Sequence, residues 1–171
     1  MQIAVVYSSH TGNTATLAAA VKEILPEEVC AFYGTSAELS DLSVVQQADM
    51  VLVGFWTDKG TCDESTAQFL QQLENKQVFL FGTAGFGGSA EFFQQILNRV
   101  MQNLAPSNVV LGTWMCQGKM PMAVRKRYES MQEQQPEQMK MMIDNFDRAL
   151  SHPDEADLAA LQQAVQNVVE G

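Results

Sequence analysis

The stretch Ile3-Ala4-Val5-Val6-Tyr7-Ser8-Ser9-His10-Thr11-Gly12-Asn13-Thr14 joins an apolar run to a polar turn near the start of this 171-residue chain. The run Ile3–Tyr7 is typical of a strand that is buried on both faces, as parallel strands are in α/β proteins. After the turn, apolar residues recur at helical spacing from Leu17 to Leu25, and Pro26 ends the predicted helix. We therefore expect a strand, a polar turn and a helix, in that order.

The turn contains hydroxyl side chains, one Gly and one Asn, but no Lys or Arg. Hydroxyl and backbone N–H donors at a helix N-terminus favour a bound phosphate. A nucleotide-hydrolysing loop would require the pattern Gly-x-x-x-x-Gly-Lys-Ser/Thr, and the sequence contains no such string. The turn thus suits a single phosphate monoester held by hydrogen bonds. The alternative is an ordinary capped turn between a strand and a helix.

This turn resembles the loop that holds the phosphate of FMN in flavodoxins. The resemblance implies FMN as the cofactor. It also implies that every residue of the turn binds the cofactor, namely Ser9, His10, Thr11, Gly12, Asn13 and Thr14.

A second loop follows the predicted strand Met50–Phe55. Trp56 at this strand end would expose a large apolar ring unless a flat ligand covered it. Flavodoxins place an aromatic ring of the matching loop against the isoalloxazine; the alternative is a Trp folded under a neighbouring loop. The segment Asp58-Lys59-Gly60 has the composition of a turn. The resemblance assigns cofactor contacts here to Phe55, Trp56, Thr57, Asp58, Lys59 and Gly60.

A third, glycine-rich loop follows the predicted strand Val78–Phe81. Its glycines permit close approach of the backbone to a planar ligand. The spacing also fits a dinucleotide-binding fingerprint, but no acidic residue follows between Gln94 and Tyr128 to bind a ribose, so we exclude that site. Many flavodoxins have a Tyr in this loop, whereas only Phe86 is present. The outer flavin face is left to Phe86, to a Met from further along the chain, or to a bound substrate. The resemblance assigns cofactor contacts to Thr83, Ala84, Gly85, Phe86, Gly87 and Gly88.

Apolar strand runs alternate with helical patterns along the chain, which predicts a parallel sheet covered on both faces. The remaining predicted strands are Glu28–Phe32 and Val109–Trp114. The resemblance implies a flavodoxin-like three-layer sandwich with a five-stranded parallel sheet in the order 2-1-3-4-5. The other predicted helices lie at Leu42–Gln47, from Thr61 onward with a capping box formed with Glu64, at Ser89–Leu104, and at Asp154–Val169 with Ser151 as a candidate cap.

Residues 1–171 are expected to form one domain, with a helical insertion at about 119–150 before the last helix. The stretch 115–142 contains seven of the ten Met residues, and its segment 132–136 favours a break between two helices. A basic cluster of Lys119, Arg125, Lys126 and Arg127 lies here, either as a docking surface or paired with local acids.

Composition narrows the class of protein. Apolar residues make up 46% of the chain, enough for a core, and no apolar stretch reaches the roughly 20 residues that a membrane span needs. A net charge of −10 makes a nucleic-acid partner improbable. The three Cys residues have no metal-site or disulfide spacing, which favours a reducing cytoplasm. We predict no catalytic residue and no metal ligand.

The predicted function is an FMN-binding electron-transfer protein that passes low-potential electrons to a partner. Its partners would be a reductase that supplies electrons and an acceptor enzyme, and the chain itself would be a monomer or weak dimer. The alternative is an FMN-dependent quinone or nitro-compound reductase on the same fold. A third class is an interaction domain that has lost FMN. A low-molecular-weight phosphatase is excluded, since no Cys has an Arg six residues later.

Overall fold

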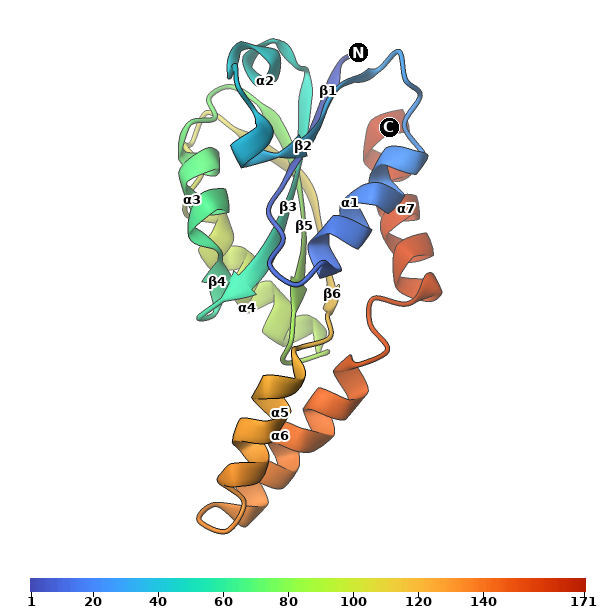
Figure 1. The fold of residues 1–171 in the computed structure, drawn as a ribbon. Helices are drawn as coiled ribbons and strands as arrows, with labels where there is room; N and C mark the ends of the chain where they lie inside the picture. Colours follow the sequence, from blue (N-terminus) through green and yellow to red (C-terminus); the bar gives the residue numbers. More distant parts are fainter.

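Five parallel strands form the central sheet in the order β2-β1-β3-β5-β6 (Figure 1). The computed structural model describes residues 1–171. The predicted order of the five strands is confirmed. The strands are β1 (Ile3–Tyr7), β2 (Cys30–Thr35), β3 (Met50–Asp58), β5 (Gln77–Ala84) and β6 (Val109–Gln117).

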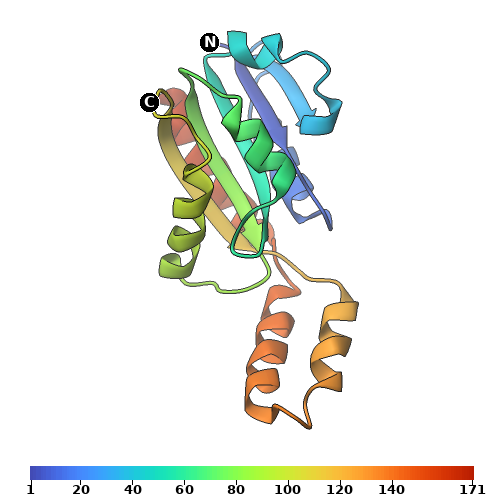
Figure 2. The same cartoon turned by 90° about the vertical axis from the view of Figure 1, so that its left-hand side faces the viewer.

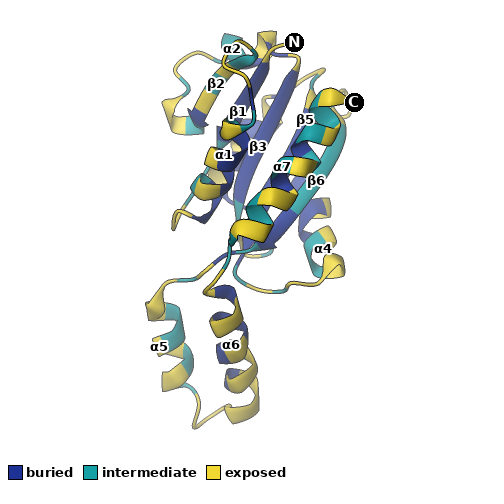
Figure 3. Cartoon of the chain, turned by 90° about the vertical axis from the view of Figure 1, so that its right-hand side faces the viewer, coloured by how far each residue is buried: buried dark blue, intermediate teal, exposed yellow.

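Helices cover both faces of the sheet, and each face has its own apolar core (Figures 2 and 3). Side chains of successive strand residues point to opposite faces, so Ile3 and Val5 join one core while Ala4 and Val6 join the other. The first core packs against α1 (Asn13–Glu23) and α7 (Glu155–Glu170). The second packs against α2 (Ser43–Gln47), α3 (Glu64–Gln71) and α4 (Ala90–Met101).

A short strand, β4 (Thr61–Cys62), occupies the place where we expected a helix to begin. Lys59 and Gly60 have φ angles of 55° and 83°, so the chain reverses there, and Thr61 and Cys62 pair antiparallel with the end of β3. The capping box at Thr61 was therefore a wrong prediction. The side chain of Asp63 caps α3 instead.

Other boundaries differ from the sequence prediction as well. The strands predicted to end at Phe55, Phe81 and Trp114 continue to Asp58, Ala84 and Gln117, so Trp56 and Thr57 lie on the end of β3, and the helix predicted at Ser89–Leu104 spans Ala90–Met101. The strand β2 begins at Cys30 instead of residue 28, because the chain before it forms turns in which the N–H of Val29 donates to the carbonyl of Pro26 and the N–H of Cys30 donates to that of Glu27. The helix α7 is capped by Asp154 rather than Ser151, in a reciprocal pair with Asp157. The capping residue lies next to the helix start, where its carboxylate reaches the free N–H groups.

Two helices, α5 (Met122–Ser130) and α6 (Pro136–Ala149), project from the sheet at the carboxyl ends of its strands (Figures 1 and 2). We call residues 119–150 the α5–α6 hairpin and the rest of the chain the body. No residue of α5 is buried, whereas α6 buries Met139, Ile143, Asn145, Phe146 and Ala149. None of the helices has the length and hydropathy needed to cross a membrane.

Candidate functional site

The turn between β1 and α1 presents six consecutive backbone N–H groups, from Ser9 through Thr14, that have no acceptor within the chain. Gly12 takes a φ of 94°, which turns the chain into the helix. The hydroxyl of Ser9 accepts a hydrogen bond from the N–H of Ala15 at 3.1 Å and so supports the first helical turn. Free N–H groups at a helix N-terminus form a site for an anion.

Thr14 and Phe55 lie beneath this turn. The hydroxyl of Thr14 is fully buried, donates to the carbonyl of Phe55 at 3.0 Å and lies 3.2 Å from the hydroxyl of Thr83. The Phe55 ring is buried in the core against Gly82. Both residues are 0% exposed and neither lines the cavity, so these two predicted binding residues support the site from below instead of contacting a ligand.

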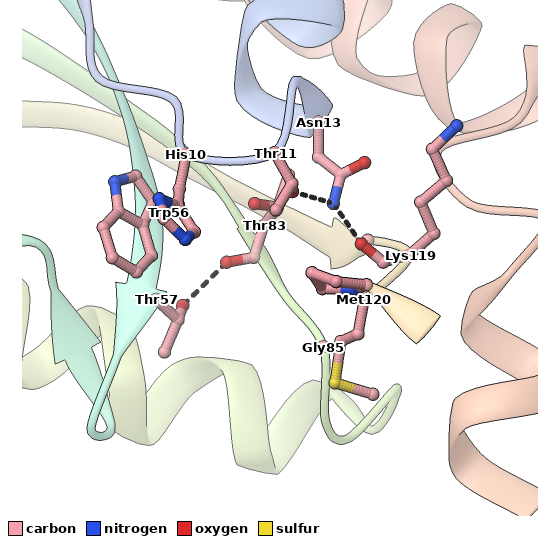
Figure 4. Close-up of a pocket in the computed structure, with 11 residues that line it drawn as sticks. His10, Thr11, Asn13, Trp56, Thr57, Thr83, Gly85, Lys119 and Met120 are labelled. Carbon is pink, nitrogen blue, oxygen red and sulfur yellow. Dashed lines mark hydrogen bonds between the residues drawn. The ribbon is translucent and has the colours of Figure 1, made fainter. Parts of the chain in front are cut away.

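A cavity of about 190 Å³ opens between the three predicted loops and the start of the α5–α6 hairpin (Figure 4). The rings of His10 and Trp56 stack at one side of it, with centroids 4.8 Å apart and planes inclined by 22°. The residues that line the cavity are His10, Thr11, Asn13, Trp56, Thr57, Thr83, Gly85, Gly118, Lys119, Met120 and Pro121.

The Trp56 loop is fixed from below by hydrogen bonds. The buried carboxylate of Asp63 accepts from the N–H of Trp56 at 3.4 Å, and the N–H of Asp63 donates back to the carbonyl of Trp56 at 3.1 Å. The Thr57 hydroxyl donates to the carbonyl of Thr83 at 2.7 Å, which ties this loop to β5. At the tip, Arg99 of α4 donates to the carbonyl of Gly60 at 3.0 Å. The predicted residues Asp58 and Lys59 are exposed in this tip and do not line the cavity.

Of the six residues predicted to bind in the third loop, Thr83 and Gly85 line the cavity, whereas Ala84, Phe86, Gly87 and Gly88 do not. The N–H groups from Gly85 through Gly88 have no acceptor within the chain, so they are available to an edge of a ligand. Phe86 is 38% exposed and lies on a separate surface groove beside α6, not in the cavity. The aromatic residue of this loop, Phe86, is therefore not part of the cavity that Trp56 lines.

The sequence did not assign Gly118, Lys119, Met120 or Pro121 to the site, yet these four residues line it. The Nδ2 of Asn13, a buried residue, donates to the carbonyl of Lys119 at 2.9 Å. The ammonium of Lys119 extends away from Trp56 and Thr57 (Figure 4). A usable signal was the glycine at 118 directly after a strand end, at the same edge of the sheet as the three predicted loops.

Comparison with known proteins agrees with this arrangement. The family model described as "Flavodoxin domain" matches residues 4–166. The chain is 37% identical to the "Flavodoxin-like domain-containing protein BilS" of Clostridium symbiosum, over 95% of this chain and 93% of that one. It is 30% identical to the protein of the same name from Clostridioides difficile, over 99% and 97%.

The chain belongs to the flavodoxin family. Among solved structures, a short-chain flavodoxin associated with a non-canonical PDU bacterial microcompartment covers 99% of this chain, with a TM-score of 0.62 at 16% identity, which supports the fold. Flavodoxins as a family bind a flavin and transfer electrons. Membership of the family therefore supports flavin binding and electron transfer by this chain.

The cavity suits a flavin in three respects. It is lined by the aromatic ring of Trp56 and by Gly85, whose N–H has no acceptor within the chain. It is also bordered through His10, Thr11 and Asn13 by the turn at the start of α1, which contains no Lys or Arg. Rings with large apolar faces stack on aromatic side chains, and the polar edge of such a ring takes hydrogen bonds from backbone N–H groups.

The two thiols near the site, Cys62 and Cys116, are buried. Burial raises the pKa of Cys62 to about 11, with the nearby Asp63 carboxylate acting in the same direction. Burial also raises the pKa of Cys116 far above its usual range. Because the thiolate is the reactive form, neither side chain is a candidate nucleophile.

His152, Asp154 and Asp157 are close enough together to suggest a metal site. Each side chain already has a structural partner at the start of α7: Asp154 and Asp157 form its capping box, and His152 Nδ1 lies 2.6 Å from the carboxylate of Asp157. We therefore read this cluster as the cap of the helix.

Proposed function

We propose that this chain binds FMN and acts as an electron carrier, taking low-potential electrons from a reductase and passing them to an acceptor enzyme. The observation that carries the proposal is the run of N–H groups without an acceptor in the turn that follows β1, whose residues His10, Thr11 and Asn13 line the same cavity as Trp56. A turn without Lys or Arg suits a phosphate monoester better than a di- or triphosphate, whose larger charge calls for a cation.

The chain's residues divide the work of binding. The turn from Ser9 to Asn13 would hold the phosphate, the Trp56 ring would pack on the isoalloxazine, and the N–H group of Gly85 would bind its polar edge. FMN, when bound, supplies one- and two-electron redox chemistry. The protein orients the ring and restricts water around it.

The phosphate assignment is tested by comparing FMN with riboflavin, which lacks the phosphate. We expect FMN to bind about 100-fold more tightly, because hydrogen bonds to a charged group contribute about 1.5–3 kcal/mol each. Quenching of flavin fluorescence measures both dissociation constants. Thr11→Val should weaken FMN and leave riboflavin unchanged, whereas the matched Thr113→Val on β6 should alter neither. No flavin binding by the wild-type protein would end the proposal.

An anaerobic reductive titration of the FMN-loaded protein, followed by visible absorbance, distinguishes an electron carrier from an FMN-dependent reductase. Reduction in two resolved one-electron steps supports the carrier. Reduction in a single two-electron step, with rapid reoxidation by a quinone, would support the FMN-dependent quinone or nitro-compound reductase instead.

A further inference from the structure

The first residues of the α5–α6 hairpin form the side of the cavity that faces Trp56 (Figure 4). The Met120 side chain lies directly on the backbone of Gly85: a Cβ added to Gly85 would meet the Cγ and Sδ of Met120 at 2.6 Å each. The side chain at 120 therefore fills the space that any residue other than Gly at 85 would require. An apolar, polarisable thioether therefore packs on the backbone of Gly85 at the side of the cavity.

The second helix of the hairpin reaches back to the same glycine. Asn145 of α6 is 4% exposed, although it is polar and lies in a projecting hairpin. Its Nδ2 donates to the carbonyl of Gly85 at 2.9 Å, and its Oδ1 accepts from the Nε2 of Gln117 at 3.1 Å. One buried amide therefore connects the hairpin, the glycine-rich loop and the end of β6.

The base of the hairpin is also attached to the turn Ser9–Thr14, which precedes α1. The carbonyl of Lys119 accepts from Asn13, and the N–H of Lys119 donates to the carbonyl of His152 at 2.9 Å. Gly118 packs against the Asn13 side chain so closely that no Cβ would fit. A hairpin that only extended into solvent would need none of these contacts with the cavity.

We propose that the α5–α6 hairpin is a structural wall of the flavin site, with Met120 contacting the face of the isoalloxazine opposite Trp56 and Asn145 positioning the Gly85 loop. This inference rests on the proposed binding of FMN. It assigns Met120 as a contact residue and Asn145 as a positioning residue that acts through the Gly85 carbonyl.

Asn145→Asp tests the positioning role, because a carboxylate still accepts from Gln117 but cannot donate to Gly85. Asn108→Asp is the matched control: Asn108 donates to the carbonyl of Leu73 at 2.8 Å and accepts from the N–H of Lys76 at 3.0 Å, at the opposite edge of the sheet. We expect the dissociation constant of FMN to rise about 10-fold or more in the first variant and to stay within about 2-fold in the second, since a lost buried hydrogen bond has about this effect.

Met120→Ala tests the contact role without disturbing a buried polar group. We expect altered visible circular dichroism of bound FMN and weaker binding of both FMN and riboflavin, because the ring and not the phosphate loses its contact. Met120→Leu, which conserves volume, should restore wild-type binding. Met101→Ala, a partly buried Met packed on the body core, should leave the flavin signal unchanged.

The failures of the two proposals are distinguishable. If the wild-type protein binds no FMN, the proposed function is wrong. If it binds FMN but Met120→Ala and Asn145→Asp behave like their controls in affinity and dichroism, the flavin site is intact and the hairpin is not part of it.

Discussion

The body and the α5–α6 hairpin are stabilised in different ways. The body contains two apolar cores of 18 and 13 buried residues, one on each face of the sheet. The hairpin buries four apolar side chains that belong to neither core, namely Met139, Ile143, Phe146 and Ala149. Figure 3 shows the contrast between the buried sheet and the largely exposed hairpin. Buried apolar area is the main source of stability, so the hairpin should open more readily than the body.

The two regions also differ in charge. Residues 119–150 contain six of the ten Lys and Arg residues and five of the 20 acidic ones, so their formal charge is +1. The body is left at −11, which accounts for the −10 of the whole chain. An electron-transfer partner that approaches the cavity would therefore meet a mixed field: an acidic body on one side and a hairpin with local cations on the other.

The largest expected effect is in the body. Phe79 is 1% exposed and packs in the core beneath α7. Phe79→Ala should lower the free energy of unfolding by about 3–5 kcal/mol, because the lost transfer energy adds to that of a cavity. Urea denaturation followed by far-UV circular dichroism measures this change. A loss below 1 kcal/mol would mean that the sheet core adapts more freely than its packing suggests.

The same truncation in the hairpin should act locally. Phe146 is fully buried within α6, so Phe146→Ala removes a similar amount of buried surface from a much smaller core. We expect amides of α5 and α6 to lose protection from hydrogen exchange, while the global unfolding of the body shifts by about 1 kcal/mol or less. Equal loss of protection in the hairpin and in β1 would show that the two regions unfold together and that the hairpin does not open more readily than the body.

The body was predictable from sequence because its signals are local and repeated. The apolar run Ile3–Tyr7 coincides with β1, and the polar turn that follows does lead into α1. The errors fall where geometry depends on a turn: the positive φ angles at Lys59 and Gly60 made Thr61–Cys62 a strand. A capping-box spacing cannot be told from a hairpin turn by composition alone.

The site was predictable only where it follows strand ends. The turn at Ser9 and the ring of Trp56 were identified from their positions, and both lie at the cavity. Met120 and Asn145 were not assigned, because their contact with Gly85 joins segments separated by 35 and 60 residues and leaves no periodic pattern. Phe86 was the aromatic residue present in the third predicted loop, but it lies on the groove beside α6 and not in the cavity.

A moderate effect is expected at Asp63, which within the body links the start of α3 to Trp56. Its carboxylate caps α3 by accepting from the N–H of Thr66 at 3.2 Å and also accepts from the N–H of Trp56. Asp63→Ala should lower the free energy of unfolding by about 1–2 kcal/mol, as the loss of a helix cap does. Asp63→Asn retains one acceptor oxygen and should recover most of this stability in the same denaturation measurement. If Asp63→Ala and Asp63→Asn have the same free energy of unfolding, the Asp63 side chain does not stabilise the protein by capping α3.

A smaller effect is expected from the charge difference at the cavity. Lys119 lines the cavity and belongs to the hairpin. The cavity lies at the N-terminus of α1, whereas Lys22 lies in the last turn of that helix. Lys119→Gln should slow the oxidation of the reduced, FMN-loaded protein by anionic ferricyanide about 2-fold at low ionic strength, and Lys22→Gln should not. Stopped-flow absorbance measures both rates. The difference should vanish at 1 M salt, and a difference that persists there would have to come from structure, not from charge.

The smallest expected effect is a pH dependence within the hairpin. Arg125 donates to Asp147 through Nε and Nη2 at 3.0 and 3.2 Å, and these hydrogen bonds hold the pKa of Asp147 below its usual value. A lowered pKa in the folded state stabilises that state at pH values above the unfolded pKa near 3.8, and the contribution is lost as the pH falls through the folded pKa. A carboxyl-detected NMR titration should show the Asp147 pKa rising in Arg125→Gln. Lys126→Gln removes the same charge from the same helix but no hydrogen bond to Asp147. If both variants raise the pKa equally, the shift reflects the general positive charge of α5, and the pair does not hold α5 and α6 together.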